Sequence, residues 1–225
     1  MVTVNFDSSY NFDSLSVVIT NADVYDEEGL LKAIGDGALN VTLANDIQIK
    51  TAVEVTSEFT LDLNGYSISA PEDTEGNGIF HVLEGGKLTI NGEGIINGVG
   101  DNIYSIAIWA DGGEVIINGG TFTNVGAHKD SSIDMDNSHY DLIYVKNGGT
   151  VTINGGEFIC ETPRWTLNSN NEKLGAIVVN GGKFYEFDPS NADTDDNGAG
   201  VLVDYVGDGY VSVEVEDGYY SIVEE

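Results

Sequence analysis

The sequence predicts an all-β solenoid, in which short strands stack coil upon coil along one axis. A motif of alternating apolar residues followed by Asn-Gly recurs at nearly constant spacing, with its asparagines 27, 27, 36 and 26 residues apart. A second motif, a short strand that ends in Gly-Gly, precedes the first in the middle coils. A fixed period of this length is typical of proteins in which each repeat forms one coil, and it predicts about six coils here. The asparagines are Asn64, Asn91, Asn118, Asn154 and Asn180.

Alignment of the repeats on the asparagine produces columns of apolar residues. Positions one and three before the asparagine are apolar in every copy, and so is the position four after it. Because side chains alternate across a strand, these columns share one face and predict a continuous core. We expect the asparagine amides to hydrogen-bond from coil to coil, and the Asn-Gly pairs to form the turns because both residues tolerate positive φ. The column after the asparagine is Ile68, Ile95, Phe122, Phe158 and Phe184.

Both ends of the repeat region differ from its middle. Asp26 is a suitable N-cap for a short helix over residues 26–35, in which Leu30, Leu31 and Ile34 form an apolar stripe that would seal the first coil. Residues 200–223 are interpreted as a degenerate last coil. In the middle coils, Trp109 is expected to share a structural column with two valines of the neighbouring strands, Val82 and Val145.

The recurring Thr-Ile-Asn-Gly-Gly-x-Phe motif, with Asp-Leu-Asn-Gly before it, resembles the right-handed parallel β-helix proteins of the pectin-lyase-like superfamily. The resemblance covers roughly residues 38–223. It implies a single-stranded right-handed parallel β-helix with a short N-terminal capping helix. It does not imply one activity, because the superfamily includes polysaccharide lyases, glycosidases, adhesins and phage fibre proteins. Among these the chain is most similar to non-enzymatic phage fibre and decoration members.

The repeats divide the chain into two parts. Residues 25–225 are predicted to form the parallel β-helix domain. Residues 1–24 carry no copy of the repeat and alternate apolar and polar side chains. We expect them to be an attachment or oligomerisation segment. A hairpin on the solenoid end and a strand lent to a partner are the alternatives.

The charge balance excludes several functions. The chain has 38 acidic and 8 basic residues, which gives a formal net charge of −30. Such a field repels nucleic acids and anionic polysaccharides. Related lyases use an arginine and a basic groove, whereas Arg164 is the only arginine here. We therefore expect no enzymatic activity, although a glycan lyase or hydrolase stays open. The single cysteine, Cys160, is predicted to lie in or near the core and cannot form an intrachain disulfide.

An aspartate-rich segment has the spacing of a calcium loop. Asp193, Asp195, Asn197 and, after a glycine and five more residues, Asp204 match the pattern in which hard oxygen ligands surround one ion. The flanks are predicted strands, so the site would not be an EF-hand. A solvated loop without metal is the alternative.

Two longer connections interrupt the repeat, over residues 127–141 and 161–173. Insertions in solenoids often carry the binding face. The first contains His128, His139 and Tyr140, and the second contains Arg164 and Trp165. We expect these five side chains to contact a ligand or a partner. Trp165 would stack on a sugar ring or a neighbouring chain, or cover the flank of the solenoid.

These observations predict a structural virion protein, such as a phage capsid decoration, head fibre or tail-fibre protein. The chain opens without a secretory signal, and no apolar run reaches membrane-spanning length, which predicts synthesis in a host cytoplasm and no membrane insertion. The expected partners are further copies in a homotrimer and other virion proteins bound through the N-terminal segment. The alternatives are a carbohydrate-binding bacterial surface adhesin, which would be extracellular and bind host glycans, and, third, a polysaccharide-degrading enzyme.

Overall fold

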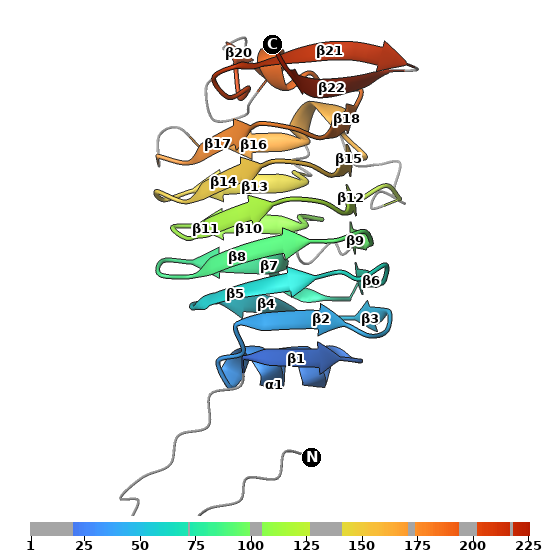
Figure 1. Ribbon diagram of the computed structural model, residues 1–225, viewed down its shortest axis with the longest axis vertical. Helices are drawn as coiled ribbons and strands as arrows, with labels where there is room; N and C mark the ends of the chain where they lie inside the picture. Colours follow the sequence, from blue (N-terminus) through green and yellow to red (C-terminus); the bar gives the residue numbers. More distant parts are fainter. Residues whose placement is uncertain are drawn as a thin grey trace, which may run out of the picture.

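The computed structural model describes residues 20–71, 73–99, 105–126, 141–170, 174–193, 202–216 and 218–225. Most of these residues lie in β-strands, which form three large sheets and one two-stranded sheet. Figure 1 shows the sheets as a stack in which the chain rises from the N-terminal helix at one end to a β-hairpin at the other.

The first two sheets contain only parallel strand pairs. The seven-stranded sheet consists of β1 (Asn21–Val24), β2 (Asn40–Leu43), β5 (Glu58–Asp62), β8 (Lys87–Asn91), β11 (Glu114–Ile117), β14 (Thr150–Ile153) and β17 (Ala176–Val179). The five-stranded sheet consists of β4 (Thr51–Val55), β7 (Glu75–Leu83), β10 (Ile108–Asp111), β13 (Ile143–Lys146) and β16 (Leu167–Ser169).

The third large sheet is parallel until its C-terminal end. It consists of β3 (Ile47–Gln48), β6 (Ser67–Ala70), β9 (Ile95–Gly98), β12 (Thr121–Thr123), β15 (Glu157–Ile159), β18 (Lys183–Tyr185), β22 (Tyr219–Glu224) and β21 (Tyr210–Glu216). From β2 to β18, consecutive strands along the chain lie in different large sheets, and three consecutive strands, one from each large sheet, form what we call a rung. The mostly β, parallel architecture expected from the repeats is confirmed.

Phenylalanine rings of successive rungs stack nearly parallel to one another in the core. Phe122, Phe158 and Phe184 are fully buried and in register on β12, β15 and β18. The ring centroids of Phe122 and Phe158 lie 5.1 Å apart with an interplanar angle of 8°, and those of Phe158 and Phe184 lie 4.7 Å apart at 7°. This column therefore matches the prediction over three successive rungs.

The asparagines form the expected ladder over four of their five copies. Asn118 Nδ2 donates to Asn91 Oδ1 at 2.8 Å, Asn154 Nδ2 to Asn118 Oδ1 at 2.9 Å, and Asn180 Nδ2 to Asn154 Oδ1 at 3.1 Å. Asn64 instead donates to the carbonyl oxygen of Leu43. Stacked amides thus connect the rungs at one corner.

Two alignments made on the asparagine are wrong by one or two residues. Asp62, not Asn64, is in register with Asn91, because the chain after β5 makes a wider turn in which Asn64 has φ 48°. Ile96, not Ile95, continues the phenylalanine column, and Ile95 is 42% exposed. The cause is one additional residue between Asn91 and β9.

The asparagine of most copies does not itself adopt positive φ. Among the five repeat asparagines only Asn64 does so, whereas the left-handed conformation falls on a following glycine in the other copies. Gly120 has φ 92° and Gly156 has φ 104°. The turn thus relies on glycine, and the asparagine stays at the strand end, where its amide can join the ladder.

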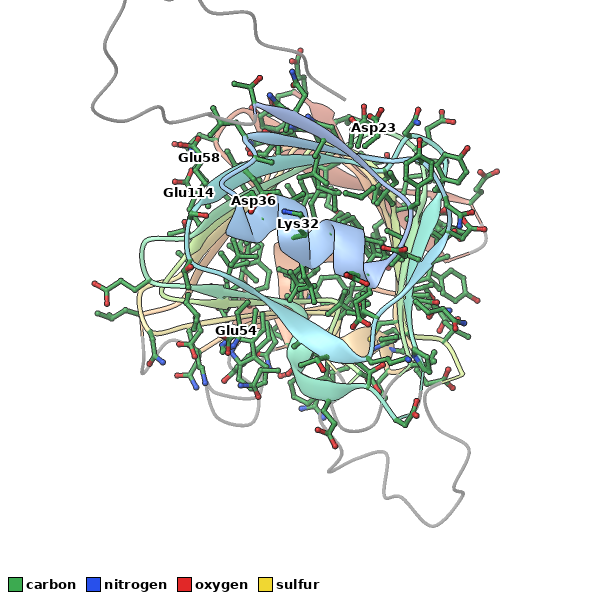
Figure 2. All side chains as sticks on the ribbon, turned by 90° about the horizontal axis from the view of Figure 1, so that it is seen from below. Asp23, Lys32, Asp36, Glu54, Glu58 and Glu114 are labelled. Atoms are coloured by element: carbon green, nitrogen blue, oxygen red, sulfur yellow. The ribbon has the colours of Figure 1, made fainter. Side chains whose placement is uncertain are left out.

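The helix α1 (Glu27–Gly35) covers the N-terminal end of the core, as predicted. Asp26 caps it by accepting a hydrogen bond of 2.8 Å from the backbone N–H of Gly29. Leu30 is fully buried, but Leu31 is 43% exposed, and Ala33 takes the second buried position. Figure 2, seen from below, shows α1 lying across the end of the stack, with Lys32 on it and Asp36 directly after it. No helix in the described part of the chain is long and apolar enough to span a bilayer.

The C-terminal end is closed by antiparallel strands, which the prediction of a degenerate last coil did not anticipate. The hairpin β21–β22 joins β18, and Tyr220 pairs with Phe184, so Tyr220 does continue the apolar column. Strands β19 (Ala192–Asp193) and β20 (Leu202–Val203) form the small antiparallel sheet. At the other end β1 pairs with β2, so residues 21–24 of the predicted N-terminal segment belong to the seven-stranded sheet. Residues 1–19 lie outside the described residues.

Candidate functional site

The outer face of the five-stranded sheet gathers aromatic side chains into one column. His81 on β7, Trp109 on β10 and Tyr144 on β13 are in register, and we call them the aromatic column. The expected alignment of Trp109 with Val82 and Val145 is wrong, because Ala110 pairs with both valines. The glycine corner after β10 is one residue shorter than its neighbours, so alignment on Gly-Gly shifted Trp109 onto the buried face.

The three rings of the aromatic column meet edge to face. The centroids of His81 and Trp109 lie 5.8 Å apart at 61°, and those of Trp109 and Tyr144 lie 5.1 Å apart at 85°. Lys146 Nζ lies 4.4 Å from the centroid of the Trp109 ring, within the range of a cation–π contact. His81 is buried, while Trp109 and Tyr144 are half-buried. The column therefore presents ordered aromatic surface between polar groups.

Asp111 connects the aromatic column to the charged groups beside it. Its Oδ2 lies 3.3 Å from His81 Nε2 and 3.4 Å from Lys146 Nζ, and its Oδ1 accepts a hydrogen bond of 2.5 Å from Asn147 Nδ2. Burial alone raises the pKa of Asp111, but the hydrogen bonds from Asn147 and His81 and the charge of Lys146 outweigh it. The net pKa lies below the ordinary carboxyl value, so Asp111 is ionised at neutral pH.

Buried amides support the other end of the column. Asn168 on β16 pairs with Tyr144 across the sheet and donates from Nδ2 to Asp141 Oδ1 at 2.9 Å. Asn170 Nδ2 donates to the hydroxyl of Tyr144 at 3.3 Å. Since Asn168 is 1% and Asp141 5% exposed, these bonds hold the rung in place beneath the Tyr144 ring. Partly exposed aromatic rings with charged groups beside them are suited to binding a ring-shaped polar molecule.

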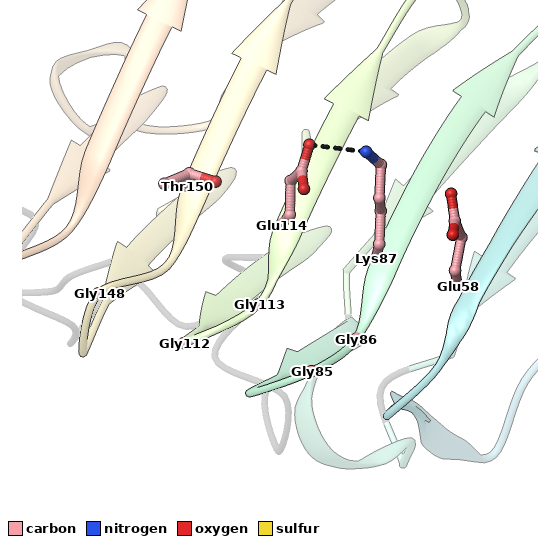
Figure 3. A pocket seen from close by; sticks show the side chains of 9 residues that line it. All are labelled: Glu58, Gly85, Gly86, Lys87, Gly112, Gly113, Glu114, Gly148 and Thr150. Atoms are coloured by element: carbon pink, nitrogen blue, oxygen red, sulfur yellow. Dashed lines mark ion pairs between the residues drawn. The ribbon is translucent and has the colours of Figure 1, made fainter.

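A shallow groove runs along the corner between the seven- and five-stranded sheets (Figure 3). Its volume is about 380 Å³, and most of its lining is glycine. These glycines are required by the corner, because a Cβ on Gly86 would lie 2.1 Å from Val55 O and one on Gly113 2.6 Å from Leu83 O. Lys87 Nζ lies 2.9 Å from Glu114 Oε1 within it. The hydrogen bond to Glu114 raises the pKa of Lys87, so the pair is ionic and links two rungs.

The structure places four of the nine site residues predicted from sequence. Arg164 Nη2 lies 2.8 Å from Asp193 Oδ2, and the Arg164 guanidinium lies 4.6 Å from the centroid of Trp165. Trp165, in the 3₁₀-helix η2 (Pro163–Trp165), is only 3% exposed, which fits the expected alternative that it covers the flank. Asp204 Oδ1 accepts a hydrogen bond of 2.9 Å from Val206 N.

The other five predicted residues lie outside the described residues. They are His128, His139, Tyr140, Asp195 and Asn197. Within the described ranges no group of three or more His, Cys, Asp or Glu side chains could hold a metal ion. The calcium site therefore stays a prediction. It requires Asp193 either to leave Arg164 or to bind Arg164 and the calcium ion together.

The buried thiol of Cys160 confirms the prediction of a core position. It is 3% exposed, and burial raises its pKa to about 11. A thiol of this pKa is protonated at neutral pH and is a poor nucleophile.

Comparison of the chain with protein-family models found no match, and neither did searches of curated proteins and of solved structures.

Proposed function

We propose that the chain is a single-stranded right-handed parallel β-helix that serves as a structural protein of a virus particle. A phage capsid decoration, head fibre or tail-fibre protein is the form we favour. The rungs, the asparagine ladder and the stacked phenylalanines support a stiff element whose length comes from repetition. Its role would be passive display of an acidic surface, without turnover of a substrate.

The observation that carries this proposal is an uncharged column on the outer face of the seven-stranded sheet. Five residues in register on successive strands are β-branched and partly exposed. They are Thr60, Thr89, Ile116, Thr152 and Val178. In a chain with a net charge of −30, copies repel one another except where carboxylates are absent. A flat column of Thr, Ile and Val is therefore the surface through which we propose that three copies associate.

The rest of the proposal concerns attachment. The part of residues 1–24 that precedes β1 would bind other virion proteins, and the loops that interrupt the repeat would face outward. Calcium bound through Asp193, Asp195, Asn197 and Asp204 would stiffen one of these loops. The protein would be made in a host cytoplasm and end in the virion.

Cross-linking of engineered cysteines tests the proposed trimer. In Ile116→Cys the new thiols of neighbouring copies lie close to the three-fold axis, so a short bismaleimide should yield covalent dimers and trimers on a denaturing gel. Cys160 does not interfere, because its buried thiol is protonated. Thr123→Cys, on the outer face of the third sheet, is the matched control and should stay monomeric. Equal cross-linking of the two variants, or none in Ile116→Cys, would contradict the proposed interface.

A second candidate function, carbohydrate binding, is favoured by the aromatic column. Trp109 and Tyr144 offer partly exposed rings, and Lys146 offers a cationic hydrogen-bond donor beside them. A glycan array followed by calorimetry of the best ligand tests this function. Trp109→Ala should weaken binding at least tenfold, whereas Tyr25→Ala should not, since Tyr25 is an aromatic residue of 61% exposure outside the column. Loss of binding in both variants, or in neither, would exclude the column as the site.

A further inference from the structure

The hairpin strand β21 leaves one edge of the third large sheet open. In the strand order β21 is the terminal member, and within the described residues only β22 pairs with it. Figure 1 shows β21 at the C-terminal end of the stack, away from the rungs. Its pairing with β22 is continuous from Tyr210 to Glu214 and shifts register between Glu214 and Glu216. An open edge offers backbone donors and acceptors to any strand that can approach.

The outer surface of this hairpin is more apolar than an end cap requires. Terminal units of repeat proteins usually present a polar outer face, which keeps them soluble. Here Val213 is 40% exposed, Val215 49% and Val223 43%. Val213 lies opposite Ser221, and Val223 lies opposite Val211, so the exposed valines gather across the two strands. The cap thus carries apolar surface that its own domain leaves uncovered.

Exposed carboxylates alternate with these valines along the hairpin and decide which strand can approach. Glu214, Glu216, Glu224 and Glu225 are all exposed. Lys183 Nζ lies 4.0 Å from Glu216 Oε1, at the limit of an ion pair. Pairing of β21 with β21 of a second copy would bring like charges together across the new ladder, which is unfavourable.

We propose that β21 is a docking edge for an extended segment of another protein in which Lys or Arg alternates with apolar residues. The segment would add a strand beside Tyr210–Glu214 through main-chain hydrogen bonds. Its apolar side chains would cover the valines, and its cations would face the glutamates. Strand addition to an open edge obtains affinity from the backbone and specificity from alternate side chains. The inference is independent of the virion proposal, because it rests only on the hairpin.

The experiment uses the full chain and the acetylated, amidated peptide KVKVKVK as probe. Amide hydrogen exchange is measured with and without the peptide at physiological salt. We expect protection to rise at least tenfold at the alternate amides between Tyr210 and Glu214 that point to the open edge, and to stay unchanged at β1, the strand at the opposite end of the stack. The peptide KPKPKPK has the same charge, but its prolines lack backbone N–H groups, so it should give no protection.

Matched charge reversals separate docking from general attraction to an acidic protein. Glu214→Lys combined with Glu216→Lys should weaken binding of KVKVKVK at least tenfold. Glu54→Lys combined with Glu58→Lys changes net charge equally at exposed positions remote from the hairpin and should leave binding within twofold. Equal weakening by both double variants, absence of protection at β21, or association of the chain with itself through β21 would each overturn the proposal. Exchange at β22 without peptide verifies that both variants keep the hairpin.

Discussion

Truncation of Phe158 tests whether the stacked column stabilises the rungs beyond ordinary burial. The Phe158 ring is fully buried and stacks on Phe122 and on Phe184, so Phe158→Ala removes two aromatic contacts and opens a cavity between rungs. Truncation of a buried Phe costs about 3–5 kcal/mol, and each lost aromatic pair adds about 0.5–1.5 kcal/mol beyond the burial. We expect a loss of about 4–5 kcal/mol for Phe158→Ala.

The matched control is Phe59→Ala, near the N-terminal end of the stack. Phe59 is 1% exposed but pairs with Leu88 and not with a ring, so its truncation should cost about 3 kcal/mol. The assay is urea unfolding followed by far-ultraviolet circular dichroism, with the free energy of unfolding extrapolated to water. The reasoning is refuted if Phe158→Ala costs less than Phe59→Ala, or if it costs under about 1.5 kcal/mol, which is the range of a surface change or a collapsed cavity.

Four further predictions use the same unfolding assay. Asn154→Ala removes two hydrogen bonds of the ladder and should lower the free energy of unfolding by about 1–2 kcal/mol. A loss near zero would show that water replaces these bonds. Asp26→Ala removes the helix cap and should lower the free energy of unfolding by about 1 kcal/mol. An unchanged value would show that packing alone holds α1. Because burial raises the pKa of Cys160 from 9.0 to about 11, only the unfolded chain releases this proton in that range. The free energy of unfolding should therefore fall as pH rises from 9 to 11, and less steeply in Cys160→Ala. The pKa of Asp111 is lowered in the folded chain, so its ionised form contributes to the free energy of unfolding. The difference in this free energy between wild type and Asp111→Asn should be constant above pH 5 and should shrink as pH falls below the ordinary carboxyl pKa of 3.8. A difference that does not change with pH would exclude an ionic role for Asp111.

Much of the fold could be predicted because period-two alternation and a repeated turn motif determine which side chains face inward. The core column of Phe122, Phe158 and Phe184 and the ladder from Asn91 to Asn180 follow directly from the repeat. The predicted strand register was wrong where the length of a turn changed by one or two residues. The wider turn after Asp62 and the additional residue before Ile96 shift every later side chain of their strands.

The aromatic column was missed for the same reason. Alignment on the glycine corner placed Trp109 among valines, although alternation from Ala110 would have turned it outward beside His81 and Tyr144. The network around Asp111 was beyond sequence reasoning, because Asp111, His81 and Asn147 come from three different rungs. The antiparallel hairpin at the C-terminus was also missed, since alternating strands look alike in parallel and antiparallel pairs.

The central proposal is that this chain is a structural β-helix that assembles through the uncharged column on the outer face of the seven-stranded sheet. The most direct test is the solution mass of the purified chain by light scattering, at physiological salt, with calcium and with EDTA. We predict a homotrimer of about 72 kDa, three times the chain mass of 24.0 kDa, in at least the calcium condition. A mass of 24.0 kDa under both conditions would contradict the claim.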